Sequence, residues 1–205
     1  MDSTCVHCDK NSITLNHTIY ETGEFRVVCD MHPLTEGHLL IIPKKHVGCV
    51  GAFPTDLYNE FFILYKQFSK FIKSTYGYVS TFEHGVIGQT VFHAHTHILP
   101  FHGNVSAVIF EGSTYVEKFN DQAKLKDVFE KKGKYLFFSL QEVNYLVNTI
   151  LGKPRFFRDR FAKALGVENR GNWKTMHEDK ELMDLATKEI ESVERNWRIF
   201  SRSKS

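Results

Sequence analysis

The chain of 205 residues lacks several features that define other classes of protein. No apolar run approaches the roughly 20 residues that a membrane-spanning helix needs. The N-terminus shows no basic region followed by an apolar stretch, so we expect no secretory signal and a cytoplasmic location. A formal net charge of only +2 argues against the broad basic face of a dedicated nucleic-acid-binding protein, so nucleic acid is not expected as a partner.

Cysteine is scarce as well. The four cysteines of a chain in a reducing compartment are expected to be ligands or buried thiols rather than disulfides. Two of them form the motif Cys5-Val6-His7-Cys8, and no second pair with this spacing completes a four-cysteine site. A redox-active pair, an incidental pair and one half of a zinc site with two histidines therefore all stay open.

The pattern of apolar residues predicts an α+β fold. Strand-like runs at 25–29 and 39–42 predict a β-hairpin within 18–46, and apolar residues at three- and four-residue steps predict a helix over 54–75, with Thr55 as its N-cap. Two further strands, at 78–82 and 91–99, complete an antiparallel sheet with the long helix between two hairpins. We assign residues 1–105 to this unit.

Residues 106–205 are expected to form a mixed α/β extension packed on the first unit, because no low-complexity linker separates the two halves. Hydrophobic patterns within the extension predict strands at 107–110, 135–138 and 145–147 and helices at 121–132, 156–165 and 182–197.

The most informative segment is a row of three histidines at every second position, His93, His95 and His97. Their neighbours are apolar or β-favouring, so the segment is predicted to be a strand. Side chains alternate along a strand, so the three imidazoles would project from one face at steps of about 6.5 Å. The opposite face would be buried by Phe92, Ala94, Thr96 and Ile98. Such a row of imidazoles suits either a metal ion or a phosphate group.

The residues before the row favour phosphate over metal. In the segment 85–90, glycines allow close approach of the backbone, and the Gln89 amide and Thr90 hydroxyl add neutral donors to an anion cradle. A tri-histidine catalytic zinc site is the main alternative. It is sterically awkward, because the middle imidazole of three on one strand would have to share an ion with both neighbours.

These segments together resemble the histidine-triad (HIT) superfamily of nucleotide hydrolases and transferases. The matching segments are 88–99, 37–46 and Asp30 within Val28-Cys29-Asp30-Met31, in the family's order and spacing, over about the first half of the chain. The resemblance implies a HIT-like fold that binds a nucleoside phosphate over the triad, and a homodimer. The stretch 154–158 is similar to the extensions of bacterial HIT hydrolases of the diadenosine polyphosphate type.

The resemblance also implies catalytic roles. His95 would be the nucleophile, because a neutral imidazole attacks phosphorus without the repulsion that hydroxide meets, giving a covalent nucleotidyl-histidine. His97 would contact the phosphate and assist the leaving group, and His38 would lie alongside and orient the row.

Substrate-binding roles follow in the same way. Gln89 and Thr90 would bind phosphate oxygens where charge develops. Asp30 matches the position that bonds the ribose hydroxyls, and Met31 and Ile19 would line the base pocket.

The resemblance extends to a metal. Some members of the superfamily pair an N-terminal C-x-x-C with two histidines, at positions that match His46 and His93. Cys5, Cys8, His46 and His93 would then form a closed structural zinc site that anchors the N-terminus to the catalytic strand. His7, inside the short loop between the cysteines, is not expected to be a ligand.

One segment departs from the family. Where several HIT enzymes carry Asn or Gln as a phosphate contact, this chain has Phe82-Glu83-His84-Gly85. We include Glu83 among the substrate-binding residues, although a carboxylate beside a phosphate must be protonated, bridged by a cation or turned away, and orienting a histidine is its alternative role. Arg155 or Arg158 would reach a distal phosphate or form a surface salt bridge.

The sequence therefore predicts a nucleotide phosphohydrolase or nucleotidyl transferase that cleaves at the α-phosphate. A diadenosine polyphosphate or a related adenylate is the expected substrate. The alternatives are a hydrolase of AMP phosphoramidates or adenylylated products, and a non-catalytic zinc-stabilised module that senses nucleotides.

Overall fold

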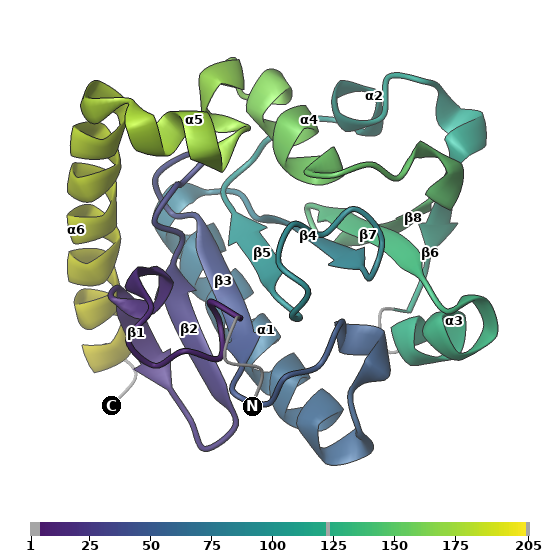
Figure 1. The fold of residues 1–205 in the computed structure, drawn as a ribbon, viewed down its shortest axis with the longest axis horizontal. Coiled ribbons are helices and arrows are strands. Elements are labelled where there is room, and N and C mark those ends of the chain that lie inside the picture. The colour runs from purple at the N-terminus through teal and green to yellow at the C-terminus, as the bar shows by residue number, and fades with distance from the viewer. Residues whose placement is uncertain (1–4, 122–123, 204–205) are drawn as a thin grey trace.

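The computed structural model describes residues 5–121 and 124–203. They form an α+β fold around one sheet, in which eight strands follow the order β1-β2-β3-β5-β4-β7-β8-β6 and every pair of neighbours is antiparallel (Figure 1). The α+β class and the antiparallel sheet predicted from the sequence are confirmed. The strands are β1 (Thr18–Glu21), β2 (Phe25–Cys29), β3 (Leu39–Pro43), β4 (Ser80–Gly85), β5 (Thr96–Leu99), β6 (Val116–Phe119), β7 (Tyr135–Leu140) and β8 (Val143–Val147).

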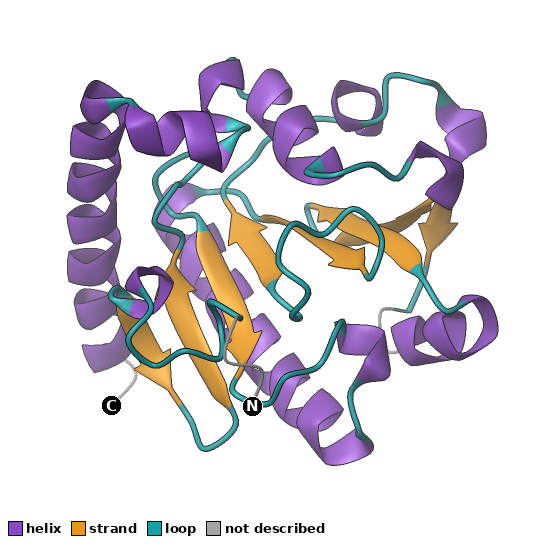
Figure 2. Ribbon diagram, viewed as in Figure 1, coloured by secondary structure: helices purple, strands orange, loops and turns teal. Residues whose placement is uncertain are grey.

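Helices cover both faces of the sheet (Figure 2). Among the described helices, none combines the length and the apolar character that crossing a membrane requires. The helices are α1 (Thr55–Tyr76), α2 (Val105–Val108), α3 (Leu125–Lys132), α4 (Phe156–Ala164), α5 (Trp173–Glu178) and α6 (Lys180–Arg202).

Helix α1 lies behind the sheet in the view of Figure 1 and packs on it through the apolar stripe that its sequence predicts. It ends at Gly77, whose φ of +86° a glycine adopts without steric penalty. Thr55 is not the N-cap: the extended Pro54 precedes the helix, and no side chain caps it. The buried members of the stripe are Leu57, Phe61, Leu64, Phe68, Phe71 and Ile72.

The C-terminal helix α6 adds to the same apolar layer, so the first and second halves of the chain share one core. Trp197 stacks on Phe68 of α1 with ring centroids 4.5 Å apart. Ile190 and Val193 are buried in the same cluster, as the predicted amphipathic pattern requires, whereas Leu185 is 45% exposed.

The second half of the chain continues the sheet rather than building a separate one. Strand β7 pairs with β4 over Ser80 to Gly85, and β8 and β6 extend the sheet beyond it. The strand predicted at 107–110 is wrong: the Asn104 side chain accepts a hydrogen bond from the Ala107 backbone and caps helix α2 there. The pattern also missed β6 and α5. The helix predicted at 121–132 is found as α3, which begins at Leu125. Residues 122–123 of the predicted range lie outside the described residues.

Candidate functional site

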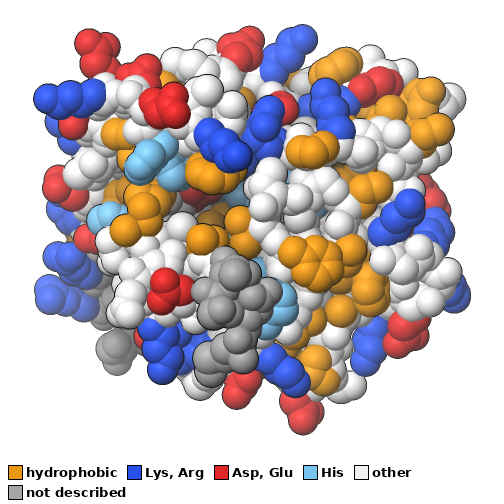
Figure 3. All heavy atoms as spheres, in the orientation of Figure 1, with side chains coloured by type: hydrophobic (Ala, Val, Ile, Leu, Met, Phe, Trp, Pro, Cys, Tyr) orange, Lys and Arg blue, Asp and Glu red, His pale blue; other side chains and the backbone are white. Residues whose placement is uncertain are grey.

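A cleft of about 530 Å³ lies on the face of the sheet opposite α1. Figure 3 shows the hollow near the centre of this face, with histidine side chains visible inside it. Its floor comes from β3, β4 and β5, and its walls come from the N-terminal segment, the loop at 88–92 and helices α4 and α5. Deep in the cleft lie Asp30, His84, His95, His97 and Arg158.

The histidine row is not a single strand, which corrects the sequence prediction. Strand β5 begins at Thr96, so His93 and His95 lie in the loop before it. The Ala94 backbone N–H donates to the Val47 carbonyl, a loop group, and this contact sets the course of the chain here. Phe92 is 59% exposed instead of buried, while Ala94, Thr96 and Ile98 are buried as expected.

The three rings of the row do not converge on one point. His95 and His97 lie side by side with ring centroids 5.1 Å apart. His93 instead turns toward the N-terminal cysteines, with its Nδ1 3.4 Å from the Sγ of Cys5. Among the described residues, two groups of side chains have donor atoms close enough to share an ion, and neither group contains all three histidines of the row. This geometry therefore does not support the tri-histidine metal site.

The tautomer of His95 is fixed by a backbone carbonyl. Its Nδ1 lies 2.6 Å from the carbonyl oxygen of His93, and because a carbonyl only accepts, Nδ1 must donate. Enclosure in the cleft lowers the pKa of His95. Near neutral pH the ring is therefore neutral, and Nε2 carries a free lone pair as a nucleophile requires.

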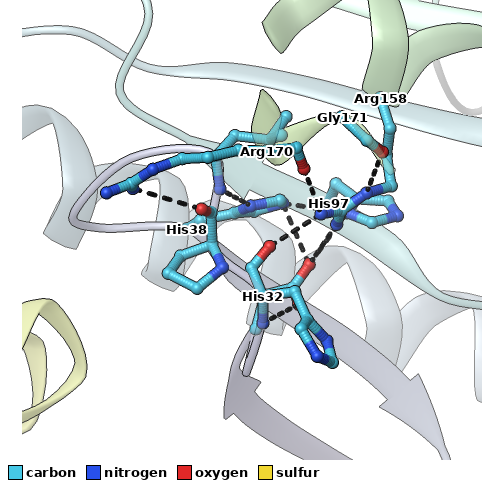
Figure 4. A network of polar contacts seen from close by, with 9 residues as sticks. His32, His38, His97, Arg158, Arg170 and Gly171 are labelled. Atoms are coloured by element: carbon cyan, nitrogen blue, oxygen red, sulfur yellow. Dashed lines mark hydrogen bonds and ion pairs between the residues drawn. The ribbon is translucent and has the colours of Figure 1, made fainter. Parts of the chain in front are cut away.

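A second chain of hydrogen bonds fixes His38 and His97 (Figure 4). The Leu34 backbone N–H donates to Nδ1 of His38 at 3.1 Å, so the proton of the neutral His38 ring is on Nε2. This Nε2 donates to Nδ1 of His97 at 2.9 Å. Burial lowers the pKa of His38 to about 4 and holds that of His97 well below its ordinary value. His97 therefore keeps its proton on Nε2, as a neutral donor.

Asp30 is held at the same end of the cleft by Arg158 (Figure 4). The Arg158 Nη1 donates to Oδ2 of Asp30 at 2.7 Å, and its Nη2 donates to the His32 carbonyl at 2.7 Å. Further bonds run to the carbonyls of Arg170 and Gly171. Burial alone would raise the pKa of Asp30, but the charge of Arg158, followed by His38, lowers it below its ordinary value.

This ion pair bears on two sequence expectations. Arg158 is buried, so its ion pair is not a surface salt bridge, and its guanidinium donates to internal acceptors. Asp30 accepts from Arg158 on Oδ2 and from the His32 backbone on Oδ1. Since a carboxylate offers about four acceptor sites, capacity for a ribose hydroxyl is left.

Replacing Arg158 by Met is expected to lower the free energy of unfolding by about 3–5 kcal/mol, because it leaves the Asp30 carboxylate buried without its partner. Urea denaturation measures the loss. The control is Arg155→Met, since Arg155 pairs with Asp159 near the surface and such a pair contributes about 1 kcal/mol or less. Equal losses of unfolding free energy in the two variants would contradict the role of Arg158 as the partner of the buried Asp30 carboxylate.

The four residues predicted to hold zinc lie together, with one donor atom from each within 4.8 Å of the others. Cys8 Sγ is 3.2 Å from Nδ1 of His46 and 3.5 Å from Nδ1 of His93. A tetrahedral zinc ion with ordinary bond lengths separates sulfur and nitrogen ligands by about 3.5 Å. His93 donates its Nε2–H to the Pro43 carbonyl at 2.8 Å, which leaves Nδ1 free to bind a metal. The donor set fits zinc.

The other predicted binding residues divide between the cleft and its surroundings. Met31 and Thr90 line the cleft. Gln89 does not: its Nε2 donates to the Gly48 carbonyl at 2.7 Å, and its Oε1 is buried without a partner among the described residues. Ile19 packs against the core on the α1 side, away from the cleft.

Glu83 points away from the cleft, so a substrate-binding role for it has no support in the geometry. Side chains alternate along β4, which directs its neighbours Phe82 and His84 to the cleft and Glu83 to the opposite face. Its carboxylate accepts from the Val50 backbone at 2.7 Å and from the Tyr135 hydroxyl at 2.5 Å. Burial raises the pKa of Glu83 to about 7. It therefore supports the packing behind the site.

The sequence prediction missed four residues that line the cleft. His7 is buried with its ring centroid 5.3 Å from that of His95. His84 lies on the floor, and Trp173 and His177 approach from helix α5, where His177 shares a hydrogen bond of 3.1 Å with His32. His84 falls in the segment that departs from the family pattern, and His7 lies in the C-x-x-C motif, but neither position indicated a place in the cleft.

Burial of His84 predicts a pH effect on stability. Its pKa falls from 6.5 to about 3, so the unfolded chain takes up a proton below about pH 6.5 that the folded protein does not bind. The stability that this residue contributes is therefore complete above pH 6.5 and declines as the pH falls. Relative to His84→Gln, wild type is expected to lose about 2 kcal/mol between pH 7 and pH 5 in urea denaturation. A difference that does not change with pH would contradict this.

Comparison with known proteins identifies the family. The HIT domain matches residues 14–104. An uncharacterised HIT-like protein of Mycoplasma genitalium is 35% identical over 105 residues, which cover 48% of this chain and 73% of that protein. The chain therefore belongs to the HIT family, whose members are generally nucleotide hydrolases or transferases.

Two further similarities are more distant. The adenosine 5′-monophosphoramidase of Saccharomyces cerevisiae is 29% identical over 129 residues, covering 61% of this chain and 80% of that protein. Among solved structures, a HIT family protein from Bacillus anthracis is 28% identical, covers 50% of this chain and 76% of its own, and superimposes with a TM-score of 0.44.

Proposed function

We propose that this protein cleaves a nucleotide at its α-phosphorus through a covalent nucleotidyl intermediate on His95. The observation that carries the proposal is the pair of fixed tautomers in the cleft. His95 offers a lone pair on Nε2, and His97 beside it offers a proton on Nε2. A neutral nucleophile next to a neutral donor is the arrangement that attack on an anionic phosphorus requires.

In the first step, Nε2 of His95 forms a bond to the α-phosphorus, and the bond from phosphorus to the leaving group breaks. The positive charge that develops on the His95 ring is stabilised by its Nδ1–H bond to the His93 carbonyl. The Nε2–H of His97 hydrogen-bonds the leaving atom as charge develops there. In the second step, water or another acceptor attacks phosphorus, displaces His95 and releases the nucleoside monophosphate or its transfer product.

The nucleoside end of the substrate is proposed to lie toward Asp30. The cleft there is lined by the apolar side chains of Met31 and Leu40 and by Trp173, which suits a base. The free acceptor sites of the Asp30 carboxylate suit the ribose hydroxyls. An adenylate such as a diadenosine polyphosphate is the substrate that we propose.

The proposal is tested by trapping the intermediate. The protein is mixed with a diadenosine polyphosphate, quenched in alkaline denaturant after milliseconds to seconds, and analysed by intact mass and peptide mapping. A single adenylyl group on the peptide that contains His95 is expected. Nucleotide binding without an adduct or turnover would instead identify a sensing module, and an adduct on another residue would overturn the assignment.

A phosphoramidate substrate is the second candidate, because the yeast relative is named as an adenosine 5′-monophosphoramidase. The same attack on phosphorus would then break a P–N bond. The ratio of kcat/KM for AMP phosphoramidate and for a diadenosine polyphosphate, measured on one preparation, decides between the two substrates.

We further propose that Cys5, Cys8, His46 and His93 hold a structural zinc ion. When bound, the ion would tie the N-terminal segment to the loop before His95 without taking part in the reaction. The homodimer and the cytoplasmic location stay predictions. Sedimentation velocity and fractionation of cells expressing the tagged chain test them.

A further inference from the structure

His84 has no role in the mechanism above, yet it lies on the floor of the cleft and is 4% exposed. It sits on the same face of β4 as Phe82, whose ring stacks on His97 with centroids 4.1 Å apart. Phe82 offers no hydrogen-bond donor. His84 is therefore the polar group that β4 presents to the cleft.

Helix α4 determines which nitrogen of His84 carries the proton. The backbone N–H of Phe157, in the first turn of α4, donates to Nε2 of His84 at 3.2 Å. The first amides of a helix have no partner within it, so this N–H is free to bind a side chain. Accepting it requires a lone pair on Nε2, and the proton of the neutral ring is then on Nδ1.

His84 lines the cleft, and Nδ1–H is the polar group of its ring that the bond from Phe157 leaves available. No group within residues 5–121 and 124–203 bonds this nitrogen, and it is not completely enclosed by the protein. The ring cannot turn over without breaking the bond from Phe157, whose own side chain is fully buried in the core. The result is a rigid neutral donor.

A glycine-containing loop packs against the Cδ2 edge of the His84 ring. The glycine-containing loop meets α4 at His84: the Gly88 carbonyl accepts from the Arg155 backbone at 3.1 Å. Gly88 has a φ of +81°, and a Cβ there would lie 2.5 Å from the Lys153 carbonyl oxygen and 3.3 Å from the His84 ring. Only glycine allows this approach. It brings the start of the 88–92 loop against His84, in a cleft that also contains His95 and Arg155.

We propose that His84 binds the phosphate of the nucleotide through Nδ1–H, as a neutral donor whose tautomer is held by helix α4. The inference rests on the proposed function, because it names a phosphate contact in the same site. A fixed donor that carries no charge stabilises charge developing on a phosphate oxygen without reorganising. The extension thus contributes to binding through a contact that 1–105 alone cannot make.

Binding of AMP and of adenosine separates this role from a structural one. In His84→Leu, the dissociation constant for AMP is expected to rise on the order of 10-fold or more, the effect of losing a hydrogen bond to a charged group. That for adenosine, which lacks the phosphate, should not change. In the matched variant His84→Gln, the amide oxygen can accept from Phe157 and the amide nitrogen can donate to the cleft, so AMP affinity should stay within about threefold.

Nitrogen-15 spectra of the histidine side chains provide an independent measurement. His84, assigned by comparison with His84→Gln, should show the proton on Nδ1, and the Nδ1 resonance should shift on adding AMP but not adenosine. A proton on Nε2 would overturn the inference, as would equal losses of AMP and adenosine affinity in His84→Leu. If His84→Leu binds AMP normally while His95 is still adenylylated, only this inference fails. If wild type binds no AMP, the proposed function fails with it.

Discussion

Replacing His95 by Ala is expected to lower kcat on the order of 10⁴-fold and to change the dissociation constant for AMP little. The reason is that the variant removes the one Nε2 lone pair that the geometry places for attack, while Asp30 and the apolar walls of the cleft remain. Steady-state turnover of a diadenosine polyphosphate and calorimetric titration with AMP measure the two quantities.

Two controls sharpen this experiment. His102→Ala removes an exposed histidine outside the cleft and should leave kcat unchanged. In His95→Gly, added imidazole can enter the vacated space and act as the nucleophile, so part of the activity should return with increasing imidazole concentration. Turnover within tenfold of wild type in His95→Ala would exclude a nucleotidyl-histidine at this position.

Removal of the proposed zinc ion should have the second large effect. We expect the purified protein to contain one zinc ion per chain and to unfold at a much lower urea concentration once a strong chelator has removed it. Structural zinc contributes about 10–16 kcal/mol of apparent binding energy in small zinc-dependent domains, so a loss of several kcal/mol is expected here. The geometry of the cleft should also change, because His7, which lies between Cys5 and Cys8 in the sequence, packs against the ring of His95.

Cysteine variants locate the metal. Cys8→Ser should lower the zinc content to well below one per chain, whereas Cys49→Ala, which changes a buried thiol outside the cluster, should leave it unchanged. Zinc content is measured by atomic absorption. Activity that disappears on mild chelation while the urea midpoint stays constant would point to a catalytic metal and contradict the structural assignment.

The fold could be predicted from the sequence wherever local periodicity determines the structure. The stripe of α1 recurs at helical spacing from Leu57 to Ile72, so both its extent and its buried face were predictable. The segment 107–110 shows the limit, because β-branched residues favoured a strand and the Asn104 cap produced a short helix. In the row of histidines, contacts with Val47 and the cysteines outweigh the strand propensity before Thr96.

The site was predictable only in part, because local patterns do not show which distant segments of the chain meet. The resemblance to the HIT family predicted roles for His95, His97 and the four metal-ligand candidates, and the structure places the first two in the cleft and the other four together. The partners of Asp30 and His84 come from α4, at residues 157 and 158, and no local pattern relates positions so far apart in the chain. Glu83 illustrates a one-residue ambiguity: the sequence placed β4 correctly within a few residues but did not show which side chains face the cleft.

The hydrogen bonds from Leu34 through His38 to His97 all run in one direction. A single main-chain amide at the start of this relay therefore dictates which end of the last imidazole is electropositive. Were His38 to flip, His97 would present a lone pair to the anionic substrate and repel it. Under the proposed mechanism, activity therefore depends on the direction of these hydrogen bonds, and a change that removes the Leu34 amide is expected to lower activity while leaving every histidine of the site in place.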